Sequence, residues 1–178
     1  AEAQEAQPQA VTRTSQSIWW GPSGQPLPFQ DHETMIDLMR TAEVVSMEDI
    51  GEGVTKPQKV LLEKDGVRMH AIFRNVHIEK GRTELGGRIF LDFRDDSIFE
   101  CAAYELSQLL GFYNVPPAVL RKIKRDEGTL QIWIEHAMTE KNRRKDRIAP
   151  VDRIRFNKEW QMIDLFDNLV FNDDRNSG

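Results

Sequence analysis

The sequence predicts an α+β domain in which a small antiparallel sheet packs against one helix. Two hairpin signals, at Val60–Asn75 and Ala118–Glu135, each join two apolar segments through a short polar turn. Between them, Ser97–Leu110 has the apolar spacing of a helix. The chain has 178 residues, of which 39% are hydrophobic and 30% charged, and this composition suits a globular domain with a core.

The first 50 residues come before these signals. Residues 1–16 combine small residues with Gln and Glu, without periodicity, and are expected to form a disordered tail. Ser17–Gln30 combines two tryptophans and a phenylalanine with three prolines. The prolines exclude a helix and favour an extended strap with its aromatic rings on the domain body, or an aromatic patch that faces a ligand. Asp31–Thr41 is expected to be a helix capped by Asp31, so residues 17–50 form one unit of strap and helix.

The first hairpin is expected to turn at Asp65-Gly66, a pair typical of a tight turn. Residues 79–96 are rich in Gly, Arg and Asp and are expected to be a mobile insertion. The helix that follows has Ser97 as its predicted cap, Glu100 as the capping-box partner and Gly111 as its end. Its predicted buried stripe consists of Ala102, Ala103, Leu106, Leu109 and Leu110.

Val115-Pro116-Pro117 predicts an extended approach to the second hairpin, because each proline biases the preceding residue away from the helical region. That hairpin is expected to turn at Arg125–Gly128 and to place Leu130, Ile132 and Ile134 on its buried face. Residues 141–156 are predicted to form a basic connector, in which Lys141–Arg147 is a solvated loop. Asn157–Leu169 is expected to be the last helix.

The net charge, the apolar runs and the cysteine and histidine residues limit the kinds of ligand and partner that the sequence favours. The net charge of −5 favours neither a nucleic acid nor an anionic membrane, and no apolar run approaches the roughly 20 residues of a membrane span. Cys101 is the one cysteine and is expected to be a buried structural thiol, and the four histidines lack the spacing of a zinc site. The first ten residues are either a linker or the mature end left by signal cleavage, which favours an exported protein.

The octet Phe171–Gly178 carries the densest chemical signal. Its Asn172-x-Asp174-Arg175 element follows an apolar helix, as a catalytic loop for phosphoryl transfer requires. In such a loop a carboxylate faces the attacking hydroxyl and accepts its proton. The alternative is a polar chain end rich in Asn, Asp and Ser.

Three segments, in this order, resemble the secretory-pathway kinases of the Golgi casein kinase and four-jointed type. Gly53–Arg74 resembles their glycine turn and lysine-bearing strands, Ser97–Arg121 their helix and Val-Pro-Pro segment, and Asn172–Arg175 their catalytic loop. The loop has looser similarity to HipA-like and phosphatidylinositol kinases. The resemblance implies a kinase-like N-lobe at residues 51–140, and a first C-lobe helix with a truncated catalytic loop at residues 157–178.

The resemblance also implies roles for individual residues. Asp174 would be the catalytic base, and Asn172 and Arg175 would brace its loop. ATP with Mg or Mn is the implied cofactor. The residues implied in nucleotide binding are Gly51, Gly53, Lys59, Arg74, Glu100, Glu135 and Ala137.

These nucleotide-binding roles differ in their chemistry. The two glycines would let backbone amides approach the phosphates, and backbone groups at residues 135–137 would contact adenine. Arg74 stands where the family has a lysine, and its forked guanidinium cannot mimic a compact ammonium. Glu100 would orient Arg74 and is also a candidate metal ligand. The alternatives are an ordinary turn for the glycines, an exposed strand lysine for Lys59 and a capping role for Glu100.

The implied function is an ATP-dependent phosphotransferase that acts on a hydroxyl acceptor. A non-catalytic, pseudokinase-like scaffold is the alternative that Arg74 favours, and an unrelated α+β binding domain is a third. The family's main metal-holding side chains would come after Gly178, so this chain alone is expected to be inactive. A large lobe or a second chain is expected to cover the apolar side of the helix at residues 157–170, including Trp160 and Phe166.

Overall fold

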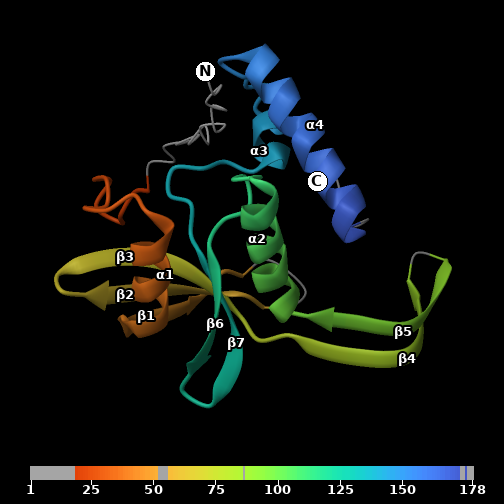
Figure 1. The fold of residues 1–178 in the computed structure, drawn as a ribbon, viewed down its shortest axis with the longest axis horizontal. Coiled ribbons are helices and arrows are strands. Elements are labelled where there is room, and N and C mark those ends of the chain that lie inside the picture. Colours follow the sequence, from red (N-terminus) through yellow and green to blue (C-terminus); the bar gives the residue numbers. More distant parts are fainter. Residues whose placement is uncertain (1–18, 52–55, 86, 173–174, 176–178) are drawn as a thin grey trace, which may run out of the picture.

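The computed structural model describes residues 19–51, 56–85, 87–172 and 175, and it has the α+β class that the sequence predicts. A five-stranded antiparallel sheet has the order β1-β2-β3-β7-β6, and β4 and β5 form a separate two-stranded ribbon (Figure 1). The strands are β1 Glu43–Asp49, β2 Gln58–Lys64, β3 Val67–Arg74, β4 His77–Leu85, β5 Arg88–Asp96, β6 Ala118–Ile123 and β7 Asp126–Ile132.

Four helices accompany the sheet in the described residues. Two of them, α1 and α2, contact the five-stranded sheet, whereas the sequence predicted one packed helix. The other two, α3 and α4, lie beyond the C-terminal end of α2 (Figure 1). The helices are α1 His32–Thr41, α2 Ile98–Leu110, α3 Glu140–Lys145 and α4 Arg153–Val170.

Helix α1 and the first hairpin form as predicted. The Asp31 carboxylate accepts a hydrogen bond from the Thr34 N–H at 2.7 Å, which satisfies one of the unpaired donors of the first turn. The turn between β2 and β3 places Asp65 and Gly66 at φ +52° and +77°. Two consecutive positive φ angles are typical of a type I′ turn, whose twist matches that of the flanking strands.

The register of the sheet separates two faces. Directly opposed residues share a face, and successive residues of a strand alternate between faces. We call the face that α1 covers the α1 face. It includes two opposed pairs from β2, β3 and β7: Val60 with Ala71, and Phe73 with Leu130. The residues of the opposite face, which we call the polar face, include Lys59, His70, Ile72, Arg74, Thr129 and Gln131.

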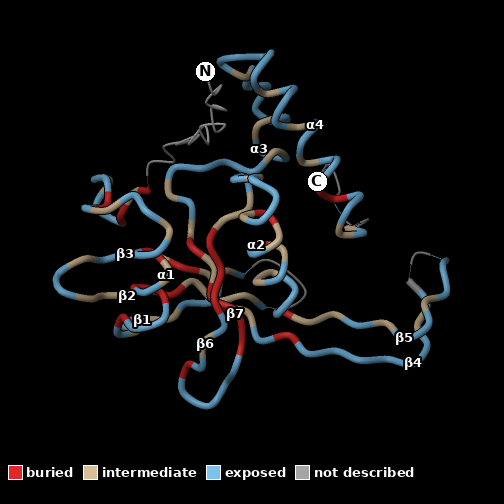
Figure 2. Tube along the Cα trace, viewed as in Figure 1, coloured by how far each residue is buried: buried red, intermediate tan, exposed pale blue. Residues whose placement is uncertain are grey.

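The core lies between α1 and the α1 face. Met35 and Met39 of α1 and Leu62 of β2 are fully buried there. Buried positions concentrate at the centre of the sheet, and few occur along the ribbon or along α4 (Figure 2). The main apolar core of this domain therefore lies on the α1 side of the sheet, and on the polar face Thr129 is buried as well.

The segment that precedes α1 is folded back rather than extended. The carbonyl of Trp19 accepts a hydrogen bond from Leu27 N–H, and Gly21 N–H donates to the carbonyl of Gln25, both at 2.8 Å. The predicted strap is therefore wrong for residues 19–27, because these backbone pairs close a compact loop. Its aromatic anchoring is confirmed at Trp19, which is buried in the core cluster.

Three strands, β1, β4 and β5, were missed by the sequence prediction. Residues 79–96 were predicted as a mobile insertion, but residues 79–85 and 88–96 belong to the paired ribbon of β4 and β5. Charged residues obscured it, although opposed pairs such as Glu79 and Arg94 form an ion pair across it at 3.5 Å. Strand β1 was missed because the register shifts between Val44 and Ser46, which breaks the alternation expected of a strand.

Helix α2 is capped and buried differently from the prediction. Asp96 Oδ1 accepts the hydrogen bond from Ile98 N–H at 2.9 Å, whereas the Ser97 side chain makes no capping bond because its backbone is already helical. The most buried helix residues are Tyr104 and Ser107. The predicted stripe is wrong at Ala102, Leu109 and Leu110, which are exposed, because the helix turns its tyrosine toward α1. Gly111 ends the helix at φ +70°, as predicted.

The second hairpin turns earlier than predicted. Strand β7 begins at Asp126, so Lys124 and Arg125 form the turn. Leu130 and Ile132 are buried as expected. Ile134 lies beyond the end of β7 and is exposed, because the alternation stops where the pairing stops.

The C-terminal part is more helical than predicted. Lys141–Arg147, predicted as a solvated loop, lies mostly in α3, which Thr139 caps through Asn142 N–H at 3.2 Å. Helix α4 begins four residues before the predicted start, since Asp152 accepts from Ile154 and Arg155 N–H, both at 2.9 Å.

The apolar side of α4 is partly covered within the chain itself. Phe166 is buried, with its ring edge-on to that of Phe112 at 6.0 Å between centroids, so the prediction that it needs an external cover is wrong. Trp160 is half-buried and stacks on Phe156. The apolar side chains that remain exposed on α4 are Ile154, Met162, Leu165 and Leu169.

Candidate functional site

The polar face carries an ion pair at the end of β3. The guanidinium Nη1 of Arg74 donates to Oε1 of Glu100, which lies in the first turn of α2. The side chains are 28% and 27% exposed, so the pair is largely withdrawn from water. Sequence analysis predicted that these two residues, 26 positions apart, would meet, and the structure brings them together.

The Glu100 carboxylate is not fully satisfied. Its Oε2 atom is buried and has no hydrogen-bond partner among the described residues. Burial raises the pKa of Glu100 above its ordinary value, and the charge of Arg74 opposes that shift. A buried acceptor with a free lone pair is costly unless a cation or a donor occupies it. This oxygen can therefore serve as one ligand of a bound cation.

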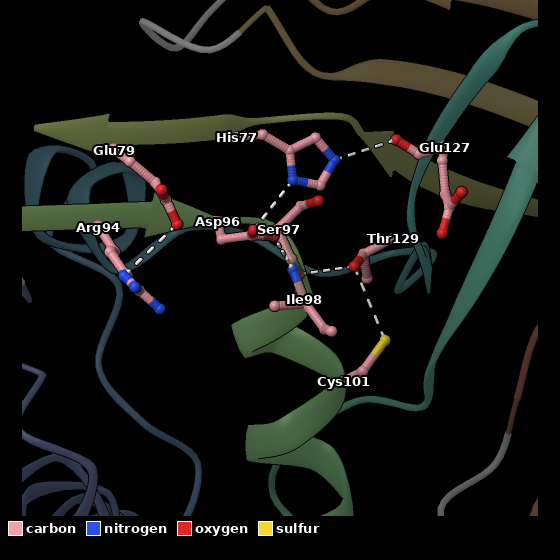
Figure 3. A network of polar contacts seen from close by, with 9 residues as sticks. All are labelled: His77, Glu79, Arg94, Asp96, Ser97, Ile98, Cys101, Glu127 and Thr129. Atoms are coloured by element: carbon pink, nitrogen blue, oxygen red, sulfur yellow. Dashed lines mark hydrogen bonds and ion pairs between the residues drawn. The ribbon is translucent and has the colours of Figure 1, made fainter.

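Thr129 of β7 holds the start of α2 against the polar face. Its hydroxyl donates to the Ser97 carbonyl at 2.6 Å and lies 3.7 Å from the Cys101 sulfur, as Figure 3 shows. Cys101 is half-buried rather than buried as predicted, and this burial raises the pKa of its thiol, which keeps it neutral. Sequence reasoning missed Thr129, because a threonine inside a strand gives no signal of a long-range contact.

Gly128 permits the close approach of β7 and β3. A Cβ atom at this position would overlap the carbonyl oxygen of Arg74. The backbone of Arg74 therefore sits where only glycine leaves room. The predicted turn residue is instead a strand residue that sets the position of Arg74.

A second polar contact ties the ribbon to the sheet beside α2. In Figure 3, the ring of His77 lies between Asp96 and the Glu127 backbone, with Nδ1 2.9 Å from Asp96 Oδ2 and Nε2 3.4 Å from the Glu127 carbonyl. The hydrogen bond to Asp96 raises the pKa of His77. The pKa of Asp96 is lowered, first by its capping bond to Ile98 N–H and then by His77.

Lys59 shares the polar face with Arg74. It lies on the neighbouring strand β2, opposite Ile72, two positions before Arg74. Its ammonium is 4.5 Å from the centre of the Trp133 ring, a cation–π contact that holds the side chain over the sheet. The structure thus places two cationic groups on adjacent strands near one end of the polar face.

Gly51 lies at the same end of the sheet. Strand β1 ends at Asp49 and β2 begins at Gln58, whose register partner Phe73 precedes Arg74. Gly51 has a φ of +74°, a conformation that L side chains rarely adopt. Gly51, two residues after the end of β1, therefore lies near the end of the sheet that carries Arg74. Gly53 lies outside the described residues.

Glu135 and Ala137 follow β7 and differ in their surroundings. The Glu135 carboxylate is 14% exposed and contacts His70 Nδ1 at 2.5 Å, so its side chain is already engaged. The Trp133 N–H donates to the His70 carbonyl at 3.0 Å, which continues the sheet contact beyond β7. Ala137 is exposed. His70 was missed by sequence reasoning and joins the polar face to this segment.

The predicted catalytic loop is described in part. Asp174 lies outside the described residues. Asn172 Nδ2 donates to Asp167 Oδ1 at 2.9 Å, and Arg175 contacts both oxygens of the same carboxylate. The Arg175 contact lowers the pKa of Asp167, which is buried. Asn172 and Arg175 therefore share one partner, Asp167 of α4, which the sequence did not indicate.

The described residues contain no group of three or more His, Cys, Asp or Glu side chains placed to hold a metal ion. Nor does any helix among them combine the length and the apolar composition that crossing a bilayer requires. No protein-family model, no curated protein and no solved structure matches the chain.

Proposed function

We propose that this chain provides the nucleotide-binding part of an ATP-dependent, kinase-like phosphotransferase that acts on a hydroxyl acceptor. The observation that carries the proposal is the Arg74–Glu100 pair, which joins the end of β3 to α2 on the polar face. A cation held by a helix carboxylate, beside a glycine-containing loop, is the arrangement that phosphate binding in kinases requires.

The two cations support phosphate binding in different ways. One nitrogen of Arg74 is used by Glu100, and its other N–H groups have no partner among the described residues. A guanidinium presents several donors in a plane and matches phosphate oxygens well. Lys59 adds a second positive charge on the adjacent strand. Together they would hold the phosphates against the polar face, with backbone amides near Gly51 approaching from the loop.

The free oxygen of Glu100 supports a further role. Since Oε2 is buried and no described residue pairs with it, it fits an oxygen ligand of Mg or Mn bound with the nucleotide. Such a metal would neutralise charge on the phosphates. In this proposal Asp174 accepts the proton of the acceptor hydroxyl, and Asp167 holds the braces of its loop, Asn172 and Arg175.

The substitution at Arg74 favours a second candidate function, nucleotide binding without phosphoryl transfer. Arginine keeps the charge of the family's lysine but occupies more room and distributes its donors over a fork. A scaffold that binds nucleotide, or that only resembles a kinase, would retain the ion pair for stability. The two candidates share the polar face and differ in whether Asp174 acts on an acceptor.

Isothermal titration calorimetry with ATP and Mn tests the nucleotide binding that both candidate functions share. We expect binding to the wild-type chain and a loss of about tenfold or more in affinity for Arg74→Met and Glu100→Gln, since each removes one charge-assisted contact. A matched control is Arg68→Met. Arg68 lies on the same strand and face and forms an ion pair with Glu63 at 2.6 Å, but at the opposite end of β3.

The control defines which outcome opposes the proposal. If the Arg68→Met and Arg74→Met chains bind ATP equally, the site is elsewhere. If the folded wild-type chain does not bind ATP with Mg or Mn, the nucleotide-binding proposal is wrong. Asp174→Ala, tested in a longer form of this chain that transfers phosphate, separates the two candidates. Loss of phosphoryl transfer supports the catalytic candidate, and unchanged transfer opposes a role for Asp174.

A further inference from the structure

A basic surface pocket that is widely open to solvent, which we call the cavity, lies between α3 and the start of α4, apart from the elements that form the polar face. It has a volume of about 450 Å³. Its lining includes four arginines, the apolar residues of the α3–α4 connection and the start of α4. The four arginines are Arg143, Arg144, Arg147 and Arg153.

Two of these arginines are held in fixed positions. Arg143 contacts both oxygens of Glu140 at 2.7 and 2.8 Å, and its Nη1 donates to the Ile148 carbonyl at 2.6 Å. Arg144 shares the same carboxylate at 2.7 Å. These contacts hold the pKa of Glu140 at about 2, with the Arg143 hydrogen bond as the largest cause. The wall of the cavity is therefore ordered before any ligand arrives.

The other two arginines have no such partner. Arg147 and Arg153 are exposed, and neither forms a side-chain hydrogen bond or ion pair with another described residue. Of the nearby carboxylates, Asp152 accepts two N–H groups of α4 and Glu140 is shared by two arginines. Four guanidiniums thus line the cavity, and among the described residues one carboxylate, that of Glu140, contacts two of them. The cavity has an excess of positive charge.

One wall of the cavity is apolar. Phe156 lies against the guanidinium of Arg143, whose Cζ is 5.0 Å from the ring centre, and stacks on Trp160 at 6.0 Å. Ile148 and Pro150 also line the cavity. A ligand that fits this site therefore combines an anionic group with a carbon skeleton that can rest on apolar surface.

We propose that this cavity binds a small phosphate-bearing ligand, a phosphate or diphosphate ester. A phosphate offers several acceptor oxygens to two forked guanidiniums, and a doubly charged group gains more from four arginines than a single carboxylate does. A nucleic acid is a poorer match, because the positive charge is confined to one cavity in a chain of net charge −5. This cavity is separate from the proposed nucleotide site on the polar face, and the proposal does not depend on that site.

The first experiment titrates inorganic pyrophosphate into the ¹⁵N-labelled chain at low ionic strength. We expect shifts in the Arg147 and Arg153 amides, and a loss of about tenfold or more in affinity for the double variant Arg147→Ala/Arg153→Ala, which removes two charge-assisted contacts. Both side chains are exposed and unpaired, so the thermal midpoint should stay unchanged. Arg125→Ala, in the exposed turn between β6 and β7, is the matched control.

Further arms separate this site from the proposed nucleotide site and from simple charge attraction. Arg74→Met should leave the pyrophosphate shifts at α3 and α4 intact, whatever its effect on ATP. Arg147→Lys/Arg153→Lys should bind more weakly than the wild type, because it keeps the charge and loses the fork. Equal affinity in the wild type and the double alanine variant, or no shift at these amides, overturns the proposal.

Discussion

The two faces of the sheet obey different physical rules. The α1 face is filled by methionine, leucine, valine and phenylalanine side chains from α1 and four strands. The polar face carries lysine, histidine, arginine and threonine, and each makes a specific contact at a defined atom. One face gives the domain its stability through area removed from water, which needs no particular partner. The other has charges that need partners.

The difference explains why the candidate site lies where it does. Burying charge is unfavourable unless another charge or a hydrogen bond compensates. On the polar face Arg74 and Glu100 compensate each other, but one oxygen of Glu100 has no partner among the residues that the structure describes. The apolar core cluster of the α1 face contains no charged side chain among the described residues. A sheet can therefore carry a face of paired charges if its other face supplies the apolar core.

The largest effect should come from neighbouring leucines of β2 that point to opposite faces. Leu62 is fully buried under α1, whereas Leu61 on the polar face is partly exposed. Leu62→Ala should lower the free energy of unfolding by about 2–5 kcal/mol, since it leaves a cavity in the core. Leu61→Ala should cost about 1 kcal/mol. Urea unfolding measures both, and equal costs would contradict the division into two faces.

The next effect concerns the ion pair. Arg74→Met leaves the buried Glu100 carboxylate without its cation and should lower the free energy of unfolding at neutral pH by about 1–3 kcal/mol. Burial already raises the pKa of Glu100 above 4.5, so its protonated form is the one that folding favours. The loss should therefore shrink as the pH falls toward the raised pKa and grow as the pH rises through it.

Thermal unfolding of Arg74→Met at pH 5 and pH 7.5 tests this sign. The double variant Arg74→Met/Glu100→Gln is the control, because it removes the buried charge together with its partner. It should lose the pH dependence. A loss that grows toward acid pH would be inconsistent with the environment described for Glu100.

The smallest effect separates two histidines. Burial beside Tyr104 lowers the pKa of His32, at the start of α1, whereas the hydrogen bond to Asp96 raises that of His77. The two rings should therefore titrate on opposite sides of 6.5 in an NMR titration. The His77 contact contributes to stability below pH 6.5 and is lost as the pH rises through its raised pKa.

Asp96→Asn provides the matched variant for this titration. Asparagine keeps the capping acceptor for Ile98 N–H but lacks the charge that favours protonated His77. The His77 pKa should fall in this variant, and the His32 pKa should not move. If the pKa of His77 stays the same in Asp96→Asn, Asp96 is not the cause of the raised His77 pKa.

Local signals predicted the elements whose hydrogen bonds close within a few residues. Asp31 capped α1, and Asp65-Gly66 turned the first hairpin, because both depend on the conformations of adjacent residues. The ribbon at residues 79–96 was missed, since its strands need each other to form a ladder and charged side chains hide their alternation. Of the contacts in the candidate site, the sequence predicted one, between Arg74 and Glu100. Thr129, Gly128 and Asp167 were missed, because their partners are set by the fold.

The sequence by itself determined the α+β class, the first helix, the tight turn of the first hairpin and the identity of the charged residues. Periodicity and backbone preference act over a few residues and can be read along the chain. The tertiary structure alone decided that β7 lies beside β3 and that α2 turns Tyr104 rather than Leu109 inward. It also decided that one oxygen of Glu100 is buried with no partner in the described part of the chain. These features arise from contacts between distant segments, whose free energy depends on how all of them pack together.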